Sequence, residues 1–316
     1  MRIKLMGVRG SMPSPSGNKE YRDKMRSILY RAVEAGLNDV SQINGFINKL
    51  PEHLQFNYGG NTTCAAVTSG SGNLYILDCG TGLKALGDDI VTKDFGKGND
   101  HIRIFLTHAH WDHIQGIPFF KPLYIPGNII EFYSPYENLR EILQNQMKPP
   151  CFPAPFEGTA STKEFHLIKS GPLNPEEGLT IDFYPLRHPG GSYAYRFKEG
   201  GKTFIFATDA EFTGGDLEKA GNEADFFLNA DLLILDSQYT LDEHFTKFEW
   251  GHTSYTVAVN CGARWGVRHL VLTHHEPGNN DKKLRQIHIE AIKHRNNMKI
   301  DKPVIHIARE GMIFNL

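Results

Sequence analysis

The sequence predicts a layered α/β protein. Short apolar runs, typical of buried strands, recur between turn-rich loops along the whole chain. Segments with apolar residues at helical spacing separate several of these runs. The expected strands outnumber the expected helices and we find no strong internal repeat, so stacked sheets and helices are favoured over a barrel of βα units. We expect one domain over residues 1–316.

The individual elements follow from the positions of these runs. The expected strands are 3–6, 64–68, 74–78, 102–107, 129–133, 179–186, 192–197, 203–207, 232–236, 269–273 and 304–308. The clearest expected helices are 83–91, 137–147, 254–265 and 281–297. The proline-rich stretch 147–156 also contains aromatic residues, which favours a rigid loop packed on the body over a linker.

An insert at about 19–55 separates the first expected strand from the second. Two groups of apolar residues in it have helical spacing, one ending before Gly36 and one before Pro51. The groups are Met25, Ile28, Leu29, Ala32 and Val33, then Val40, Ile43, Ile47 and Leu50. We therefore expect two amphipathic helices that form a lid or an interaction face.

Composition excludes several classes of protein. The 34 Lys and Arg balance 36 Asp and Glu, which gives a net charge of −2 and disfavours long polyanions as substrates. The chain contains neither an apolar run of about 20 residues nor a signal-peptide core, so we expect no membrane span and a cytoplasmic location. The four widely spaced cysteines suit reduced thiols buried in the core.

A dense group of metal-type ligands follows the strand expected at 102–107. Residues 107–113 read Thr-His-Ala-His-Trp-Asp-His. In extended chain His108 and His110 share one face, while Asp112 and His113 reach a second position from the following turn. Imidazole and carboxylate ligands together suit Zn²⁺, Mn²⁺ or Fe²⁺. The group can hold two cations. A pair of ions can clamp both the attacking and the leaving oxygen of a displacement reaction, so the group predicts hydrolysis.

Further ligand-type side chains stand where other apolar strands end. They are Asp78, His188, Asp209, Asp236 and His274. In an α/β sheet, side chains at strand ends on one edge converge on a common cleft, so we expect these residues to join the first group. Taken singly, a strand-end Asp is as consistent with a turn, and His275 could replace His274.

With these residues the chain resembles the metallo-β-lactamase superfamily, whose HxHxDH hallmark is present at residues 108–113. The resemblance implies a four-layer αβ/βα sandwich with two divalent ions, Zn²⁺ by default with Mn²⁺ or iron left open. It implies that His108, His110 and His188 hold one ion, that Asp112, His113 and His274 hold the other, and that Asp209 bridges them with a hydroxide between. It also implies that Asp78 orients a ligand histidine.

The segment Trp250-Gly-His-Thr-Ser-Tyr resembles an element of ribonuclease Z and its phosphodiesterase relatives. The resemblance implies that His252 and Asp236 pair near the scissile phosphate and help protonate the leaving oxygen. The catalytic residues expected on this basis are His252, Asp236, Asp78 and Asp112. The alternative for residues 252–254 is a simple helix start, with Thr253 or Ser254 as N-cap.

The expected function is therefore a binuclear metal-dependent phosphodiesterase acting on a small phosphodiester such as a cyclic nucleotide. Ribonuclease Z carries a basic arm that grips transfer RNA, whereas residues 147–158 here offer only Lys148, so extended nucleic acid is disfavoured. The alternatives are a thioesterase or lactonase of the same fold and a nuclease of ribonuclease Z type. Arg9, Asn61 and Arg187 are candidates for phosphate contact, and a homodimer stays open.

Overall fold

The computed structural model describes residues 1–213, 222–247 and 249–316, and the strands of this part form two sheets. The first sheet has the order β14 (Ile313–Asn315), β1 (Arg2–Gly7), β2 (Cys64–Thr68), β3 (Leu74–Leu77), β4 (His101–Phe105), β5 (Ile129–Ser134) and β6 (Thr162–Leu167). The second has the order β13 (Val304–Ile307), β12 (His269–Thr273), β11 (Leu232–Asp236), β10 (Lys202–Ala207), β9 (Ser192–Glu199), β8 (Leu179–Leu186) and β7 (Leu173–Glu176).

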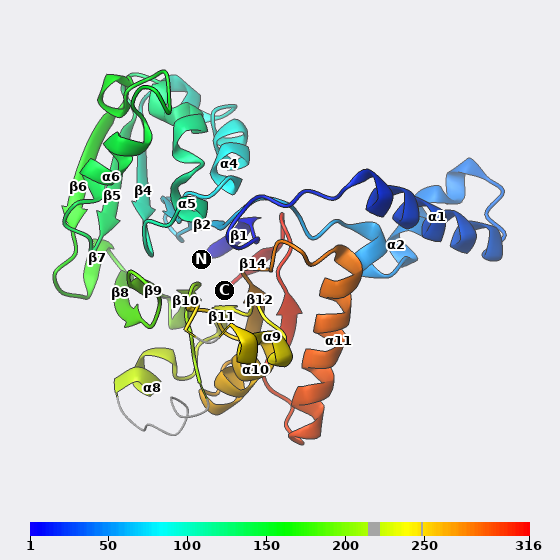
Figure 1. The fold of residues 1–316 in the computed structure, drawn as a ribbon. Coiled ribbons are helices and arrows are strands. Elements are labelled where there is room, and N and C mark those ends of the chain that lie inside the picture. Colours follow the sequence, from blue (N-terminus) through cyan, green and yellow to red (C-terminus); the bar gives the residue numbers. More distant parts are fainter. Residues whose placement is uncertain (214–221, 248) are drawn as a thin grey trace.

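The two sheets face each other and helices cover their outer faces (Figure 1). Between the sheets lies an apolar core that joins side chains such as Val67 and Phe105 of the first sheet to Phe197 and Ile234 of the second. The outer face of the first sheet packs against α4 (Gly82–Ile90) and α6 (Leu139–Gln146). The outer face of the second packs against α8 (Asn222–Phe227), α10 (Tyr255–Arg264) and α11 (Asp281–Asn297). The predicted four-layer αβ/βα sandwich is confirmed.

Strand direction brings the functional strand ends together. β3 and β4 are parallel, and so are β10, β11 and β12. β8 and β10 both pair antiparallel with β9, so β8 also ends at the same edge as β10. Just beyond three of these strands, Asp78, Asp209 and His274 have positive φ angles of 59°, 56° and 60°. Such conformations are costly for residues other than glycine and concentrate at functional sites, so we expect their side chains to matter there.

Most strand ranges expected from the sequence lie within two residues of the observed ones, but three strands were missed. β6 has Lys, Glu and His among its residues, while β7 and β14 are short strands at or near sheet edges, so none shows a strong apolar run. The second insert helix begins as the 3-10 turn η1 (Val40–Gln42) before α2 (Ile43–Lys49). The expectation that every cysteine is buried is wrong for Cys151, which is exposed on the proline-rich loop.

The insert forms an arm, defined here as residues 18–57, that extends away from the two sheets (Figure 1). It contains α1 (Asn18–Glu34), η1, α2 and α3 (Glu52–Gln55). The structure describes α1 throughout, and none of its side chains is buried. Among the described residues, no helix is both long enough and apolar enough to cross a membrane.

Candidate metal centre

The first group of ligand-type atoms comes from the loop after β4 and from the end of β8. His108 and His110 follow β4, and His188 stands two residues beyond β8. One nitrogen of each lies within 4.8 Å of the others, and His110 Nδ1 is 3.1 Å from His188 Nε2. His110 is exposed to solvent, whereas His108 and His188 are buried. The group therefore opens to solvent on the side of His110.

The second group is fully buried and joins α5 (Trp111–Ile114) to the ends of β10 and β12. It consists of Asp112, His113, Asp209 and His274, whose ligand-type atoms lie within 4.8 Å of one another. His113 Nε2 is 3.2 Å from Asp112 Oδ2 and 3.1 Å from Asp209 Oδ2. His274 Nε2 is 3.2 Å from both Asp112 Oδ2 and Asp209 Oδ1. Two carboxylates and two imidazoles thus surround one point.

Asp209 faces both groups. Its Oδ1 atom is 3.7 Å from His108 Nε2 and 3.8 Å from His188 Nε2, besides the contact with His274 in the second group. The hydroxyl of Thr208 donates to its Oδ2 at 2.6 Å. Asp209 consequently lies where a carboxylate could reach cations in both groups.

Buried partners hold the Nδ1 atoms of His108 and His113. His113 Nδ1 donates to Asp78 Oδ2 at 2.8 Å, and Asp78 also accepts the backbone N–H and the hydroxyl of Thr107. The same hydroxyl oxygen accepts from His108 Nδ1 at 3.0 Å. Because each Nδ1 is committed to an outward partner, the Nε2 of His108 and of His113 faces the cluster. Thr107 was missed by the sequence reasoning, although it directly precedes His108.

A backbone carbonyl holds His188 in the same way. Its Nδ1 donates to the oxygen of Gly251 at 2.9 Å. Gly251 has a φ of +86°, and a Cβ there would lie 2.3 Å from His188 Nδ1, so only glycine fits. Glu211, which is buried, accepts from the backbone N–H groups of Glu249 and Gly251. Glu211 therefore ties the loop that orients His188 to the strand end that carries Asp209.

The choice between His274 and His275 depends on the direction of each ring. His274 Nδ1 donates to Gln238 Oε1 at 3.1 Å, which turns its Nε2 toward the second group. His275 Nε2 donates instead to the backbone oxygen of Ala308 at 2.9 Å, away from the cluster. Gly10 packs against the His274 ring so closely that a Cβ would lie 2.4 Å from its Nδ1. Gln238, like Thr107 and Glu211, carried no signal in the sequence beyond its nearness to a strand-end residue of the ligand set.

His252 and Asp236 form a hydrogen-bonded pair beside the two groups. His252 Nδ1 donates to Asp236 Oδ2 at 2.8 Å. Asp236 is fully buried and also accepts backbone N–H groups from Asp209, Gln238 and Thr253. The helix-start alternative also holds, because Ser254 caps α10 through the N–H of Val257. Helix capping and the His252 pair are thus compatible in one segment.

Burial and neighbouring charges separate the protonation states of the cluster. Burial, helped by the neighbouring His113, holds the pKa of His108 well below its usual range, which favours the neutral ring that binds metals. Burial opposes ionisation of Asp209, but His113 and His274 hold the pKa of that carboxyl well below its usual value. Conversely, Asp209 raises the pKa of His274 to about 9 despite burial. The carboxylates therefore remain charged and attract positive charge into the centre.

The residues fit divalent cations. His108 Nε2 and His113 Nε2 are buried and have no hydrogen-bond partner among the described residues, although both face the cluster. Buried polar atoms without partners are costly, and an ion would satisfy them. Neutral imidazoles and ionised carboxylates held by outer hydrogen bonds are the usual donor set for Zn²⁺, Mn²⁺ or iron.

The three candidates for phosphate contact have partners within the protein. Arg9 is buried, and its guanidinium donates to the backbone oxygens of Gly59, Glu276 and Asn279. Asn61 donates to Glu310. Arg187 forms an ion pair with Glu211 at 3.1 Å. These side chains hold loops in place, and the guanidinium of Arg9 is not free to receive a substrate.

Comparison with known proteins places the chain in a family. The model of the beta-lactamase superfamily domain matches residues 75–275. A curated relative, ribonuclease Z of Prochlorococcus marinus (strain NATL1A), is 24% identical over 266 residues, which cover 65% of this chain and 78% of the relative.

Solved structures show the same fold. The metallo-beta-lactamase fold protein YhfI from Bacillus subtilis is 19% identical and superposes with a TM-score of 0.64, covering 99% of this chain and 98% of that one. The short form of human tRNase Z is 17% identical, with a TM-score of 0.57 over 100% and 99% of the two chains. The family match covers more than half of the chain, which therefore belongs to the metallo-β-lactamase superfamily of hydrolases.

Proposed function

We propose that the protein is a binuclear metal-dependent phosphodiesterase that cleaves a small phosphodiester such as a cyclic nucleotide. His108, His110 and His188 hold one ion, and Asp112, His113 and His274 hold the other. The position of Asp209 between the two groups supports its role as the shared ligand. Zn²⁺ is the metal that we expect, with Mn²⁺ and iron as the alternatives.

The chain's own residues divide the remaining work. When bound, the ions supply Lewis-acid stabilisation of the charge that develops on the phosphoryl oxygens. Asp78 keeps His113 in the orientation that presents Nε2 to the centre. Asp236 accepts the Nδ1 proton of His252 and so holds the ring in place, and a protonated Nε2 would donate to the leaving oxygen.

The position of His252 is the observation that carries the proposal. Its ring centroid lies 5.2 Å from that of His188 in the first group and 4.8 Å from that of His274 in the second. A proton donor beside both groups serves a leaving alkoxide, which is a strong base. A thiolate departs without a proton, so a thioesterase would have little use for this pair.

The experiment is a substrate screen of the metal-loaded protein and of its His252→Ala variant. The panel contains bis-p-nitrophenyl phosphate, 2′,3′- and 3′,5′-cyclic nucleotides, thioesters and lactones. We expect turnover of a cyclic nucleotide, and loss of most of that turnover in His252→Ala. Activity confined to thioesters or lactones, surviving in His252→Ala, would identify a carbonyl hydrolase instead.

A nuclease of ribonuclease Z type is the second candidate, because the curated relatives carry that name. Residues 147–158 argue against it, since Lys148 is their only cation and the loop is fixed to the body by the buried Met147 and Phe156. Cleavage of a precursor transfer RNA at a rate above that of the cyclic nucleotides would favour this candidate.

A further inference from the structure

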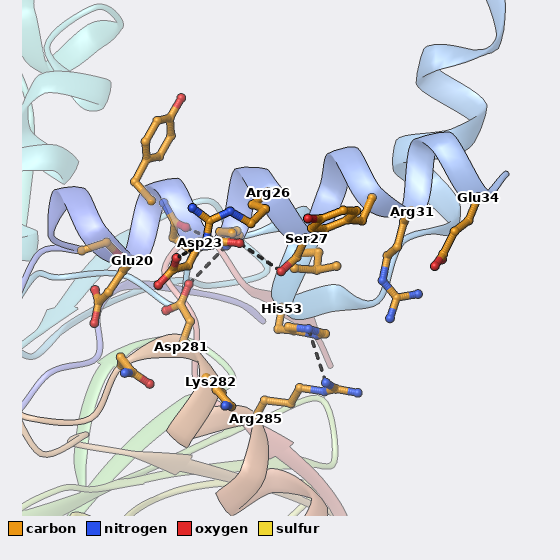
Figure 2. Close-up of a pocket in the computed structure, with 17 residues that line it drawn as sticks. Glu20, Asp23, Arg26, Ser27, Arg31, Glu34, His53, Asp281, Lys282 and Arg285 are labelled. Atoms are coloured by element: carbon orange, nitrogen blue, oxygen red, sulfur yellow. Dashed lines mark hydrogen bonds and ion pairs between the residues drawn. The ribbon is translucent and has the colours of Figure 1, made fainter. Parts of the chain in front are cut away.

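A hollow lies between the arm and the body, and none of the proposed metal ligands lines it. It has a volume of about 790 Å³ and lies between α1, the segment around α3 and the first turns of α11. We call it the arm notch. Figure 2 shows that side chains from all three elements, including Arg31, His53 and Arg285, point into the same space. Small-molecule sites have volumes of roughly 300–1,000 Å³, so the notch is large enough for a nucleotide.

Ion pairs neutralise one end of the notch. Lys24 pairs with Asp281 at 3.2 Å and Arg26 with Asp23 at 3.1 Å. Glu20 accepts the backbone N–H of Gly17 at the start of α1. The acidic side chains at this end thus already have partners.

The other end carries cations without such partners. Among the described residues, neither Arg31 of α1 nor Arg285 of α11 is within ion-pair distance of a carboxylate, although Glu34 also lines the notch. Arg285 Nη1 lies 3.4 Å from His53 Nε2, and a guanidinium can only donate in that contact. An imidazole that accepts from a guanidinium brings no negative charge, so this contact does not compensate the positive charge of Arg285.

The field at His53 reports this excess. Burial lowers the pKa of His53, and the positive charges of Arg285, Lys24 and Arg31 lower it further, with Asp281 opposing. Because Lys24 is already paired with Asp281, Arg31 of α1 and Arg285 of α11 are the two cations that act on this point without a carboxylate partner. A bound anion would relieve their mutual repulsion and tie the arm to α11.

We propose that the arm notch binds a phosphate monoester, with Arg31, His53 and Arg285 around the phosphate group. Guanidinium groups bind phosphate oxygens in bidentate geometry, and two of them from different elements define a site between them. A monoester carries close to two negative charges at neutral pH, whereas a diester carries one, so the notch prefers the monoester. The site does not depend on the proposed function, although a phosphodiesterase would release a ligand of this class.

The test measures binding by isothermal titration calorimetry to the metal-loaded full chain, with inorganic phosphate, AMP and 3′,5′-cyclic AMP as probes. We expect Arg31→Gln and Arg285→Gln each to weaken one binding event for phosphate and AMP about tenfold, the loss of one charge-assisted hydrogen bond. The matched control is Arg22→Gln, on the same helix but lining the outer groove of α1 with Met25 and Leu29. All three side chains are exposed, and thermal unfolding checks that the variants fold.

Turnover of bis-p-nitrophenyl phosphate reports on the metal centre and not on the notch, so it should be unchanged in all three variants. If AMP binds both notch variants as it binds the wild type, or if Arg22→Gln weakens binding equally, the proposal is overturned. If the protein is inactive on every phosphodiester but still binds AMP in a way that Arg285→Gln weakens, the proposed function is refuted and the phosphate site is not.

The source of the phosphate is tested with one oligonucleotide in two forms, 5′-phosphorylated and 5′-hydroxyl. The monoester proposal predicts tighter binding of the phosphorylated form, and this preference should vanish in Arg285→Gln. If both forms bind the wild type equally and both bind Arg285→Gln more weakly, the notch binds backbone diesters, and the monoester preference is overturned.

Discussion

Replacing Asp236 with Asn tests whether the pair with His252 serves the leaving group. Asp236 Oδ2 accepts from His252 Nδ1 at 2.8 Å and from the backbone N–H of Asp209 at 3.1 Å, and Oδ1 accepts from the backbone N–H of Gln238 and Thr253. Asparagine has the same shape but only one oxygen. Whether its NH₂ group takes the place of Oδ1 or of Oδ2, it faces two N–H donors there.

The structure sets the size of the effect. A buried donor that loses its acceptor costs about 1–3 kcal/mol, so two such losses predict a decrease of about 3 kcal/mol in the free energy of unfolding. General acid catalysis contributes roughly 10²–10⁴-fold to rate. Without the carboxylate the ring of His252 loses the acceptor that orients it, and we expect kcat for a cyclic nucleotide to fall at least about 100-fold.

The assay compares two substrates with different leaving groups. The leaving alkoxide of a cyclic nucleotide needs a proton, whereas p-nitrophenolate is a weak base and departs without one. Asp236→Asn should therefore lose far more activity on the cyclic nucleotide than on bis-p-nitrophenyl phosphate. An equal loss on both substrates, with metal content unchanged, would refute the role of the pair in protonation.

The control is Asp231→Asn, at the opposite end of β11. Asp231 accepts the N–H of Thr203 and pairs with Lys202 and Arg268, away from the centre. This variant should lose some stability in urea unfolding but keep the wild-type ratio of the two activities.

Four further outcomes are expected. His110→Ala should lower the metal content from two ions to one per chain in elemental analysis; two retained ions would contradict the ligand assignment. Gly10→Ala should lower kcat/KM at least about tenfold by displacing His274, while Gly17→Ala, whose Cβ meets nothing within 4 Å, should not. Burial lowers the pKa of His306 to about 4, whereas the value in the unfolded chain is near 6.5. The contribution of the neutral ring to the free energy of unfolding is therefore complete above about pH 6.5 and is lost as the pH falls toward 4. After a discount for partial exposure the loss at pH 5 is about 1 kcal/mol, and urea unfolding of His306→Gln should lack it. Removal of metal by a chelator should lower the thermal unfolding temperature, because the ions bind the folded state; an unchanged temperature would argue against a metal centre.

Much of the fold could be predicted because buried strands appear in the sequence as short apolar runs. β2, β11 and β12 are largely buried apolar runs, and their bounds match the expected ones. β6 was missed because a strand with polar residues at the edge of a sheet has no such signal. The exposure of Cys151 was missed for a related reason, since a thiol suits a loop as well as a core.

The sequence by itself determined which ligand-type side chains stand at strand ends, because a side chain's chemistry and its place after an apolar run are local properties. Only the tertiary structure decided which atoms meet. His274 and His275 are adjacent and chemically identical, yet one ring is held by Gln238 and the other by the carbonyl of Ala308. Arg9 was a candidate for phosphate until the packing of three backbone oxygens around it showed otherwise. Directions and partners of this kind depend on chain segments up to 270 residues apart, and no local pattern encodes them.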